Sequence, residues 1–423
     1  MRVSSLRLQD FRGFASCDLS LDRPLTVLVG VNGAGKTSVL EALVRLLGIT
    51  NRVSGRVRRL LVDADILRGA DACEIDLVGM TKGAPLHSMI QLKRQGRPVI
   101  NTSGSRRDIA NEGEGRASSA LPAAYYPATR MVPSERYEPE RRPLTTEYPG
   151  NLEMLESPER LSLRAQLNFK DFFEWFRFRE DFENEQRARG ETSYEDRPLT
   201  AVRKAIEQVV PGISRLRVQR IPYRLVATKD GAELELDQLS DGERGLLAMV
   251  GDLAYRLTLL NPDLPDPLQV EALVLIDEIE QHLHPAWQRM VVGALRRAFP
   301  NCQFIITTHS PQVISEVPNE AVMLLKDFQF FRPAAPTEGR DANAILWEVL
   351  GVEARPHGVV KEIEAISGLL DEGALEEARR RLDDLARALT ERDTEVARLR
   401  GLLDVVERLD MPEQLDARDH EGA

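Results

Sequence analysis

Cysteine is scarce in this sequence. Its 423 residues include three cysteines, Cys17, Cys73 and Cys302, which lie far apart along the chain. No pair has the short spacing of a zinc-binding motif, and three distant cysteines do not make a disulfide framework. The sequence therefore argues against a zinc site and against a disulfide-stabilised fold, and it favours a reducing compartment.

Long apolar runs and an excess of positive charge are also missing. No stretch approaches the length of a membrane span, and the opening MRVSSLRLQDFRGF lacks the pattern of a secretory signal. The formal net charge is −11, so any DNA contact would need a local basic patch. The absence of repeats and of sustained heptads excludes a solenoid and a long coiled coil. We expect a cytoplasmic protein that makes no membrane contact.

A glycine-rich stretch, GVNGAGKTS, lies between the apolar run LTVLV and a segment with helical spacing. Gly30, Gly35, Lys36 and Thr37 match G-x-x-x-x-G-K-[ST], in which backbone N–H groups and the start of a helix hold phosphates. Lys36 would add positive charge in catalysis, and Thr37 would offer a hydroxyl to Mg²⁺. The expected nucleotide-binding residues are Asn32, Gly33, Ala34, Gly35, Lys36, Thr37 and Ser38. The alternative is a glycine-rich turn with an unrelated lysine.

Two adjacent carboxylates, Asp277 and Glu278, follow the apolar run LVLI. Adjacent acids at the end of a buried strand are costly unless a cation lies beside them, and the Mg²⁺ of a nucleotide is the natural one. We expect Asp277 to hold the Mg²⁺ shell and Glu278 to accept a proton from the attacking water as general base. The alternative is an ordinary strand end with solvated acids.

Two further motifs admit a structural and a functional interpretation. Ser240 is followed three residues later by Glu243, the pattern of a capped helix, or Ser240 and Gly242 bind a second phosphate group in trans. His309 ends the apolar run QFIITT and could bind the γ-phosphate or orient water, although a lone histidine is more often structural.

The pattern of elements predicts an α/β fold with a mixed sheet at its core. We expect a first lobe with the phosphate loop at 1–150, and an inserted lobe of helices and a hairpin at 151–235. A second lobe at 236–338 would carry the later motifs, and a helical C-terminal tail would occupy 339–423.

The order of these motifs resembles the ABC-type P-loop ATPase heads of the RecF/SMC/OLD group. The 30–37 loop looks like Walker A, LSDGE like the ABC signature, LVLIDE like Walker B and His309 like the switch histidine. The RecF/SMC/OLD branch is indicated by two further motifs, FRGF before the 30–37 loop and E-x-x-L-H-P after LVLIDE. The resemblance implies ATP and Mg²⁺ as cofactors and a homodimer or higher oligomer formed through the heads. Asp241 replaces the usual signature glycine, and we expect it to face away from the phosphate. Gln91, Gln95 and Arg130 are weak candidates for the Q-loop residue.

Within the branch, FFEWFRFREDFENE, SDGER and DANAILWEVLGV resemble stand-alone bacterial ATPases that include PtuA of Septu anti-phage systems and retron-linked relatives. The resemblance implies an ATP-hydrolysing regulatory subunit whose head dimerisation controls an HNH-type nuclease. The aromatic segment around Phe172–Phe182 and the tail helices are candidate partner surfaces, and their alternative is core or solvated helix.

Two alternatives remain open. One is a RecF-like DNA-repair ATPase with possible direct DNA contacts, and the other is a scaffold that binds nucleotide without turnover. The candidate DNA contacts are Arg52, Arg56, Arg58, Arg59, Arg106 and Arg107.

Overall fold

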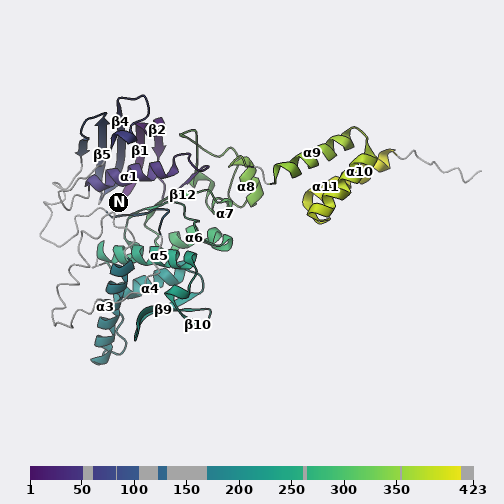
Figure 1. The fold of residues 1–423 in the computed structure, drawn as a ribbon. Helices are drawn as coiled ribbons and strands as arrows, with labels where there is room; N and C mark the ends of the chain where they lie inside the picture. The colour runs from purple at the N-terminus through teal and green to yellow at the C-terminus, as the bar shows by residue number, and fades with distance from the viewer. Residues whose placement is uncertain are drawn as a thin grey trace, which may run out of the picture. The chain divides into compact units, whose positions relative to one another are not determined.

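The computed structural model describes residues 1–50, 61–81, 83–103, 122–130, 169–260, 264–352 and 355–410. The chain forms two compact units, Met1–Leu350 and Gly351–Ala423, each of which is described by itself (Figure 1). Within the described ranges, every helix is too short or too polar to cross a membrane. The six arginines proposed as DNA contacts lie outside the described residues.

A six-stranded sheet forms the centre of the first unit, in the order β14-β13-β3-β12-β11-β7. Its strands are β3 (Leu25–Val29), β7 (Ala123–Tyr126), β11 (Leu273–Ile276), β12 (Gln303–Thr308), β13 (Val322–Lys326) and β14 (Gln329–Phe331). All neighbours pair in parallel except β13 and β14. The carboxyl ends of β3, β12 and β11 therefore meet at one edge, so the segments that follow them lie close together. The expected α/β fold with a mixed sheet is confirmed.

Both faces of β3, β11 and β12 are buried, which explains why these strands consist largely of apolar runs. Leu273 and Leu275 point into the hydrophobic core that contains α1 (Lys36–Thr50), whereas Val274 and Ile276 point into the core on the other face. Successive strand residues face opposite ways, so each strand contributes to both cores.

A five-stranded antiparallel sheet covers α1, in the order β2-β1-β4-β5-β6. Its strands are β1 (Arg2–Phe11), β2 (Phe14–Ser20), β4 (Ala72–Thr81), β5 (Ala84–Lys93) and β6 (Val99–Ser103). Gln303 at the start of β12 joins the two sheets. Its Oε1 accepts from the Val3 N–H at 2.7 Å, and its Nε2 donates to the carbonyls of Val3 and Leu21 at 2.9 and 2.6 Å.

Helices pack on the other face of the central sheet: α3 (Phe169–Ala188), α4 (Arg197–Val209), α5 (Asp241–Leu260) and α6 (Pro285–Ala298). A three-stranded sheet lies beside them, formed by β8 (Ile213–Arg220), β9 (Tyr223–Lys229) and β10 (Ala232–Glu235). The described part of the expected inserted lobe has no core of its own, because α3, α4 and β8 share one hydrophobic cluster with β3, β11 and β12.

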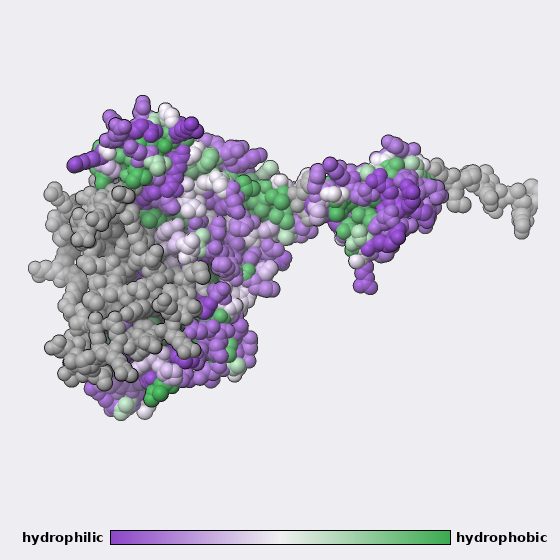
Figure 2. Space-filling model, in the orientation of Figure 1, coloured by the Kyte–Doolittle hydropathy of each residue, from purple (hydrophilic) through white to green (hydrophobic). Residues whose placement is uncertain are grey.

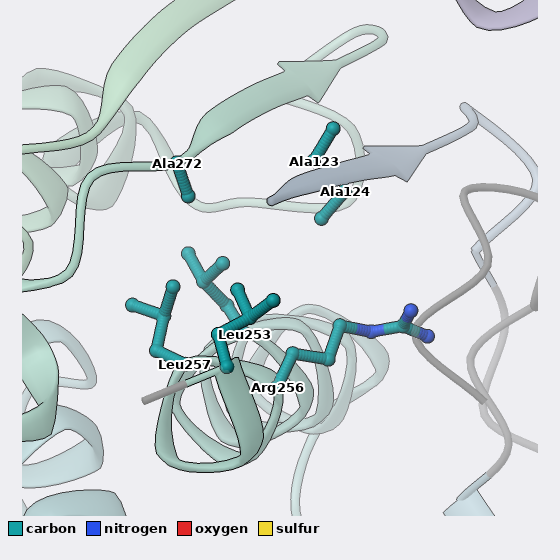
Figure 3. Close-up of a pocket in the computed structure, with 7 residues that line it drawn as sticks. Ala123, Ala124, Leu253, Arg256, Leu257 and Ala272 are labelled. Atoms are coloured by element: carbon teal, nitrogen blue, oxygen red, sulfur yellow. The ribbon is translucent and has the colours of Figure 1, made fainter. Parts of the chain in front are cut away.

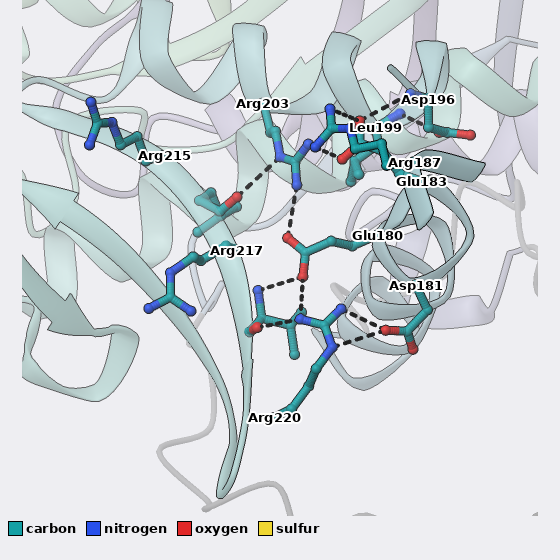
Figure 4. A network of polar contacts seen from close by, with 12 residues as sticks. Glu180, Asp181, Glu183, Arg187, Asp196, Leu199, Arg203, Arg215, Arg217 and Arg220 are labelled. Carbon is teal, nitrogen blue, oxygen red and sulfur yellow. Dashed lines mark hydrogen bonds and ion pairs between the residues drawn. The ribbon is translucent and has the colours of Figure 1, made fainter. Parts of the chain in front are cut away.

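Four aromatic residues of α3 belong to this core. Phe172, Phe173, Trp175 and Phe176 are at most 2% exposed, so they do not form the partner surface that the sequence suggested. Trp175 packs on Tyr255 of α5 with ring centroids 4.8 Å apart. The charged side of α3 is anchored too: Glu180 accepts from Arg203 of α4 at 2.8 Å and from Arg220 of β8 at 3.1 Å (Figure 4).

A small cavity of about 10 Å³ lies between α5 and the β7–β11 side of the sheet, lined by Ala124, Leu253, Leu257 and Ala272 (Figure 3). It has room for about one water molecule. Arg256 also lines it and donates to Asp252 at 2.6 Å, while the Tyr126 hydroxyl donates to the same carboxylate at 2.8 Å. This cavity is too small for a nucleotide.

Short elements complete the first unit: α7 (Pro311–Ile314), α8 (Ala342–Glu348) and the 3-10 turns Asp63–Asp65, Leu236–Gln238, Pro267–Gln269 and Asn319–Ala321. Ile345 of α8 is fully buried in the main core, so α8 belongs to the first unit. This unit ends at Leu350, later than the expected boundary at 338.

The second unit contains α9 (His357–Asp371), α10 (Leu375–Leu389) and α11 (Thr394–Asp410), which enclose a separate apolar cluster around Ile366, Leu382 and Leu399. Hydrophilic residues cover most of the surface of the described parts that Figure 2 shows. The exposed large apolar side chains include Ile221, Phe331 and Trp347.

Candidate functional site

The phosphate loop connects β3 to α1, as its sequence predicts. Gly33 and Gly35 have φ values of +83° and +106°, a region that side chains with a Cβ rarely adopt. A Cβ on Gly30 would lie 2.5 Å from the Leu325 carbonyl oxygen, and one on Gly35 would lie 2.9 Å from the Phe14 ring. Glycine at 30 and 35 is thus required by close packing around the loop as well as by its backbone.

Lys36 folds back over this loop. Its Nζ donates to the carbonyls of Gly30 at 2.7 Å and Val31 at 3.2 Å. Burial lowers the pKa of Lys36, and the nearby Glu278, Glu280 and Asp277 act against that shift. A partly desolvated cation facing three acids is well placed to exchange its carbonyl partners for phosphate oxygens.

Asp277 joins three segments that are distant in sequence. Its carboxylate is buried, Oδ2 accepts from the Thr37 hydroxyl at 2.9 Å, and Oδ1 accepts from the Thr307 hydroxyl at 2.5 Å. The parallel order β3-β12-β11 brings these groups to one edge. The structure therefore places the expected metal-binding pair, Thr37 and Asp277, in direct contact.

Mg²⁺ prefers hard oxygen ligands, and a nucleotide-bound Mg²⁺ needs only one or two from the protein. The Thr37 hydroxyl and the Asp277 carboxylate supply such a pair, 2.9 Å apart. The residues present fit the ion. No group of three His, Cys, Asp or Glu side chains suited to a metal occurs in the described ranges.

Glu278 lies in a left-handed backbone conformation, with φ of +46°. This conformation costs about 1–2 kcal/mol for a residue with a side chain. The Glu278 N–H donates to the Thr307 hydroxyl at 2.8 Å, and the Arg130 guanidinium donates to the Glu278 carbonyl at 2.8 Å. Arg130 and Thr307 thus hold the turn that presents the expected general base.

His309 is held by the carboxylate of Glu280, the first residue of the E-x-x-L-H-P motif, to which the sequence assigned no role. Oε1 of Glu280 accepts from the His309 backbone N–H at 2.7 Å and lies 3.0 Å from its Nδ1. Glu280 is 5% exposed, and its Oε2 has no hydrogen-bond partner within the described residues. If Nδ1 donates to Glu280, the other ring nitrogen, Nε2, is left for a ligand.

Ser240 caps α5 as the structural interpretation predicts. The Glu243 carboxylate accepts from the Ser240 N–H at 2.8 Å and from its hydroxyl at 3.0 Å, and Glu243 also pairs with Lys229. Asp241 is exposed and pairs with Arg244. Ser240 is exposed as well, so its role in binding a second phosphate remains a prediction.

Close packing explains why position 242 is a glycine. A Cβ there would lie 2.2 Å from the His282 carbonyl oxygen. The first turn of α5 therefore packs directly on the loop that follows Asp277 and Glu278, and glycine is required for that approach.

Arg12, which the sequence did not single out, and Arg130, one of the Q-loop candidates, complete the site. Arg12 donates to the Ser38 hydroxyl at 3.0 Å and to Glu41 at 2.5 Å, which ties the FRGF segment to the start of α1. Arg130 reaches the backbone after β11. Gln91 and Gln95, the other Q-loop candidates, lie in or after β5 of the five-stranded sheet, where Gln91 donates to Glu74 at 3.3 Å.

Two family models match the chain. The model described as "AAA ATPase domain" matches residues 1–76, and the model described as "AAA domain, putative AbiEii toxin, Type IV TA system" matches residues 127–315. These ranges contain the phosphate loop and the Asp277–Glu278 strand, respectively.

The chain is a P-loop ATPase.

Its curated relatives include "Retron Ec83 probable ATPase" of Escherichia coli, 28% identical over 84% of this chain and 77% of that protein. "Septu protein PtuA" of Bacillus thuringiensis is 23% identical over 88% of this chain and 89% of that protein. The RecF match from Cronobacter sakazakii is 42% identical but spans 19% of this chain and 24% of that protein.

Among solved structures, the SMC head bound to the C-winged helix domain of ScpA aligns with a TM-score of 0.48 and 15% identity, over 78% of this chain and 97% of that one. The expected resemblance to the Septu and retron ATPases is confirmed.

Proposed function

We propose that this ATPase is the regulatory subunit of a bacterial anti-phage defence system, in which ATP-driven head dimerisation controls a partner nuclease. The observation that carries the proposal is the 2.9 Å contact between Thr37 and Asp277 directly beside the constrained Glu278. A binding scaffold without turnover would not need that constraint. The related retron and Septu proteins supply the defence context.

Within one copy of the chain, different residues have different roles in ATP hydrolysis. The amides of the loop from Asn32 to Ser38 bind the phosphates, and Lys36 moves from its carbonyl partners to the phosphate oxygens. Thr37 and Asp277 hold Mg²⁺, which would neutralise phosphate charge. Glu278 accepts the proton of the attacking water. His309, fixed by Glu280, directs its free nitrogen to the γ-phosphate side.

The second half of the site comes from another copy of the chain. Ser240 is exposed at the start of α5, where the positive end of the helix dipole favours an anion. We propose that it closes on the γ-phosphate bound by the other copy, so ATP stabilises the homodimer or a higher oligomer and hydrolysis releases it. Since only the closed form holds both contacts, nucleotide state sets the population of dimer.

The partner we propose is an HNH-type nuclease. It is held inactive or active according to the fraction of the ATPase that is dimeric. The exposed faces of the second unit are the candidate contact surface, because α10 and α11 present charged side chains to solvent, such as Arg380 and Arg398.

The test uses the full chain expressed with its neighbouring genes. Glu278→Gln should bind ATP, shift to dimer in ATP and Mg²⁺ by light scattering, and hydrolyse slowly, whereas Glu316→Gln, an exposed control, should match the wild type. Co-purification should recover a nuclease. A Glu278→Gln protein that stays monomeric in ATP would overturn the dimerisation step.

The RecF-like alternative has a separate readout. A chain that binds DNA directly should do so alone, with affinity that falls steeply as salt rises. Tight, salt-sensitive binding without any co-purified nuclease would favour that function over the regulatory one.

A further inference from the structure

Arg130 lies at the edge of the central sheet that carries Asp277 and Glu278. It follows β7, the strand that pairs in parallel with β11, so it reaches the same sheet edge as Asp277. Asp277 N–H donates to the Tyr126 carbonyl at 2.9 Å, which fixes the two strand ends side by side.

The guanidinium of Arg130 binds three consecutive carbonyls. Nη1 donates to the carbonyl of Asp277 at 2.5 Å, and Nη2 donates to those of Glu278 at 2.8 Å and Ile279 at 3.2 Å. A left-handed residue turns its neighbouring carbonyls away from the strand ladder, so these oxygens need another donor. The planar fork of arginine can serve several at once, which the ammonium of lysine cannot do with the same geometry.

The charge of Arg130 also matters at this place. Burial lowers the pKa of Arg130, and the nearby Glu280, Asp277 and Glu278 act against that shift. Within the described part of the chain, the hydrogen bonds of the Arg130 side chain go to backbone carbonyls and not to a carboxylate, so it does not occupy the carboxylate oxygens of these acids.

We propose that Arg130 is a positioning residue for ATP hydrolysis: it holds the Asp277–Ile279 turn so that Glu278 keeps the conformation from which it activates water. The inference rests on the proposed role of Glu278 and does not depend on the partner nuclease.

The backbone of Arg130 also lies next to helix α5. A Cβ on Gly245 of α5 would lie 3.9 Å from the Arg130 carbonyl oxygen, so the Arg130 backbone is next to the turn that begins at Ser240. Arg130 thus lies between the element that serves the nucleotide of its own copy and the one proposed to serve the other copy.

The experiment compares Arg130→Ala and Arg130→Lys with Arg94→Ala in the full-length chain. Arg94 is a matched control, because it also donates to a backbone carbonyl, that of Ala70 at 2.9 Å, but lies after β5 in the five-stranded sheet. We expect kcat to fall by about 10- to 100-fold in both Arg130 variants, as a displaced catalytic group commonly costs. ATP affinity should stay within about threefold, since Lys36 and the loop are untouched.

A double variant separates positioning from general damage. Arg130→Ala combined with Glu278→Gln should be no slower than Glu278→Gln alone, because both changes remove one function. Full additivity, or an unchanged kcat in Arg130→Ala, would overturn the proposal. If Glu278→Gln itself hydrolyses ATP normally, the assignment of the general base fails instead, and the two failures are told apart.

Discussion

The hydroxyl of Thr37 donates to the carboxylate of Asp277 across 2.9 Å, although 240 positions separate the two residues in the chain. Thr37 lies in the first turn of α1 and Asp277 follows β11, with β12 between β11 and β3, the strand that precedes Thr37. This contact puts the hydroxyl and the carboxylate that we propose to hold Mg²⁺ beside the phosphate loop, at one edge of the sheet.

Removing the Lys36 ammonium should weaken nucleotide binding. A hydrogen bond to a charged group contributes about 1.5–3 kcal/mol, so Lys36→Ala should bind ATP about 10- to 100-fold more weakly. Calorimetric titration with ATP and Mg²⁺ measures the change. Lys204→Ala on the exposed side of α4 is the control, and equal affinities of the two variants would contradict the assignment.

The Thr307 hydroxyl should matter for both stability and turnover. It donates to Asp277 and accepts from the Glu278 N–H, and it is fully buried. Thr307→Val leaves both groups without that partner, which should cost about 1–3 kcal/mol of unfolding free energy and lower kcat. Thr307→Ser keeps the hydroxyl and should restore most of both quantities in denaturant titrations and ATPase assays. Equal losses in Val and Ser variants would show that the methyl group and not the hydroxyl is needed.

Gly242 and Gly245 offer a matched pair in the first turns of α5. An alanine Cβ at 242 would lie 2.2 Å from the His282 carbonyl oxygen, whereas at 245 the nearest atom is 3.9 Å away. Gly242→Ala should therefore destabilise the protein by about 1–3 kcal/mol through overpacking. Gly245→Ala should be neutral or gain up to about 1 kcal/mol from helix propensity. Thermal unfolding of both variants measures the difference in Tm. Equal Tm values would show that the loop at His282 can move aside.

Acid stability should depend in part on Glu243. Burial raises its pKa, but the contacts with Lys229 and Ser240 outweigh burial and hold the pKa below the ordinary value of 4.5. A carboxyl with a lowered folded-state pKa contributes stability above its unfolded pKa and loses it as pH falls through the folded pKa. Glu243→Gln should therefore be less stable near pH 7 and show a shallower loss of Tm from pH 5 to pH 3 than the wild type. Parallel Tm curves would contradict this role.

The sequence determined the motifs and most elements around them. The glycines and Lys36 identify the phosphate loop because few other structures need that pattern, and the apolar run before Asp277 could only be a buried strand. The capping pair Ser240 and Glu243 was also readable, because its hydrogen bonds are local.

Only the tertiary structure decided which distant groups meet. Arg130, Thr307 and Glu280 act on residues that strand order brings to them, and no local pattern encodes such contacts. The buried aromatic face of α3 was ambiguous for the same reason: an apolar stripe shows that a helix is covered, but the packing partners decide by what. Local sequence fixes backbone shape and charge, whereas the order of parallel strands fixes which ends share an edge.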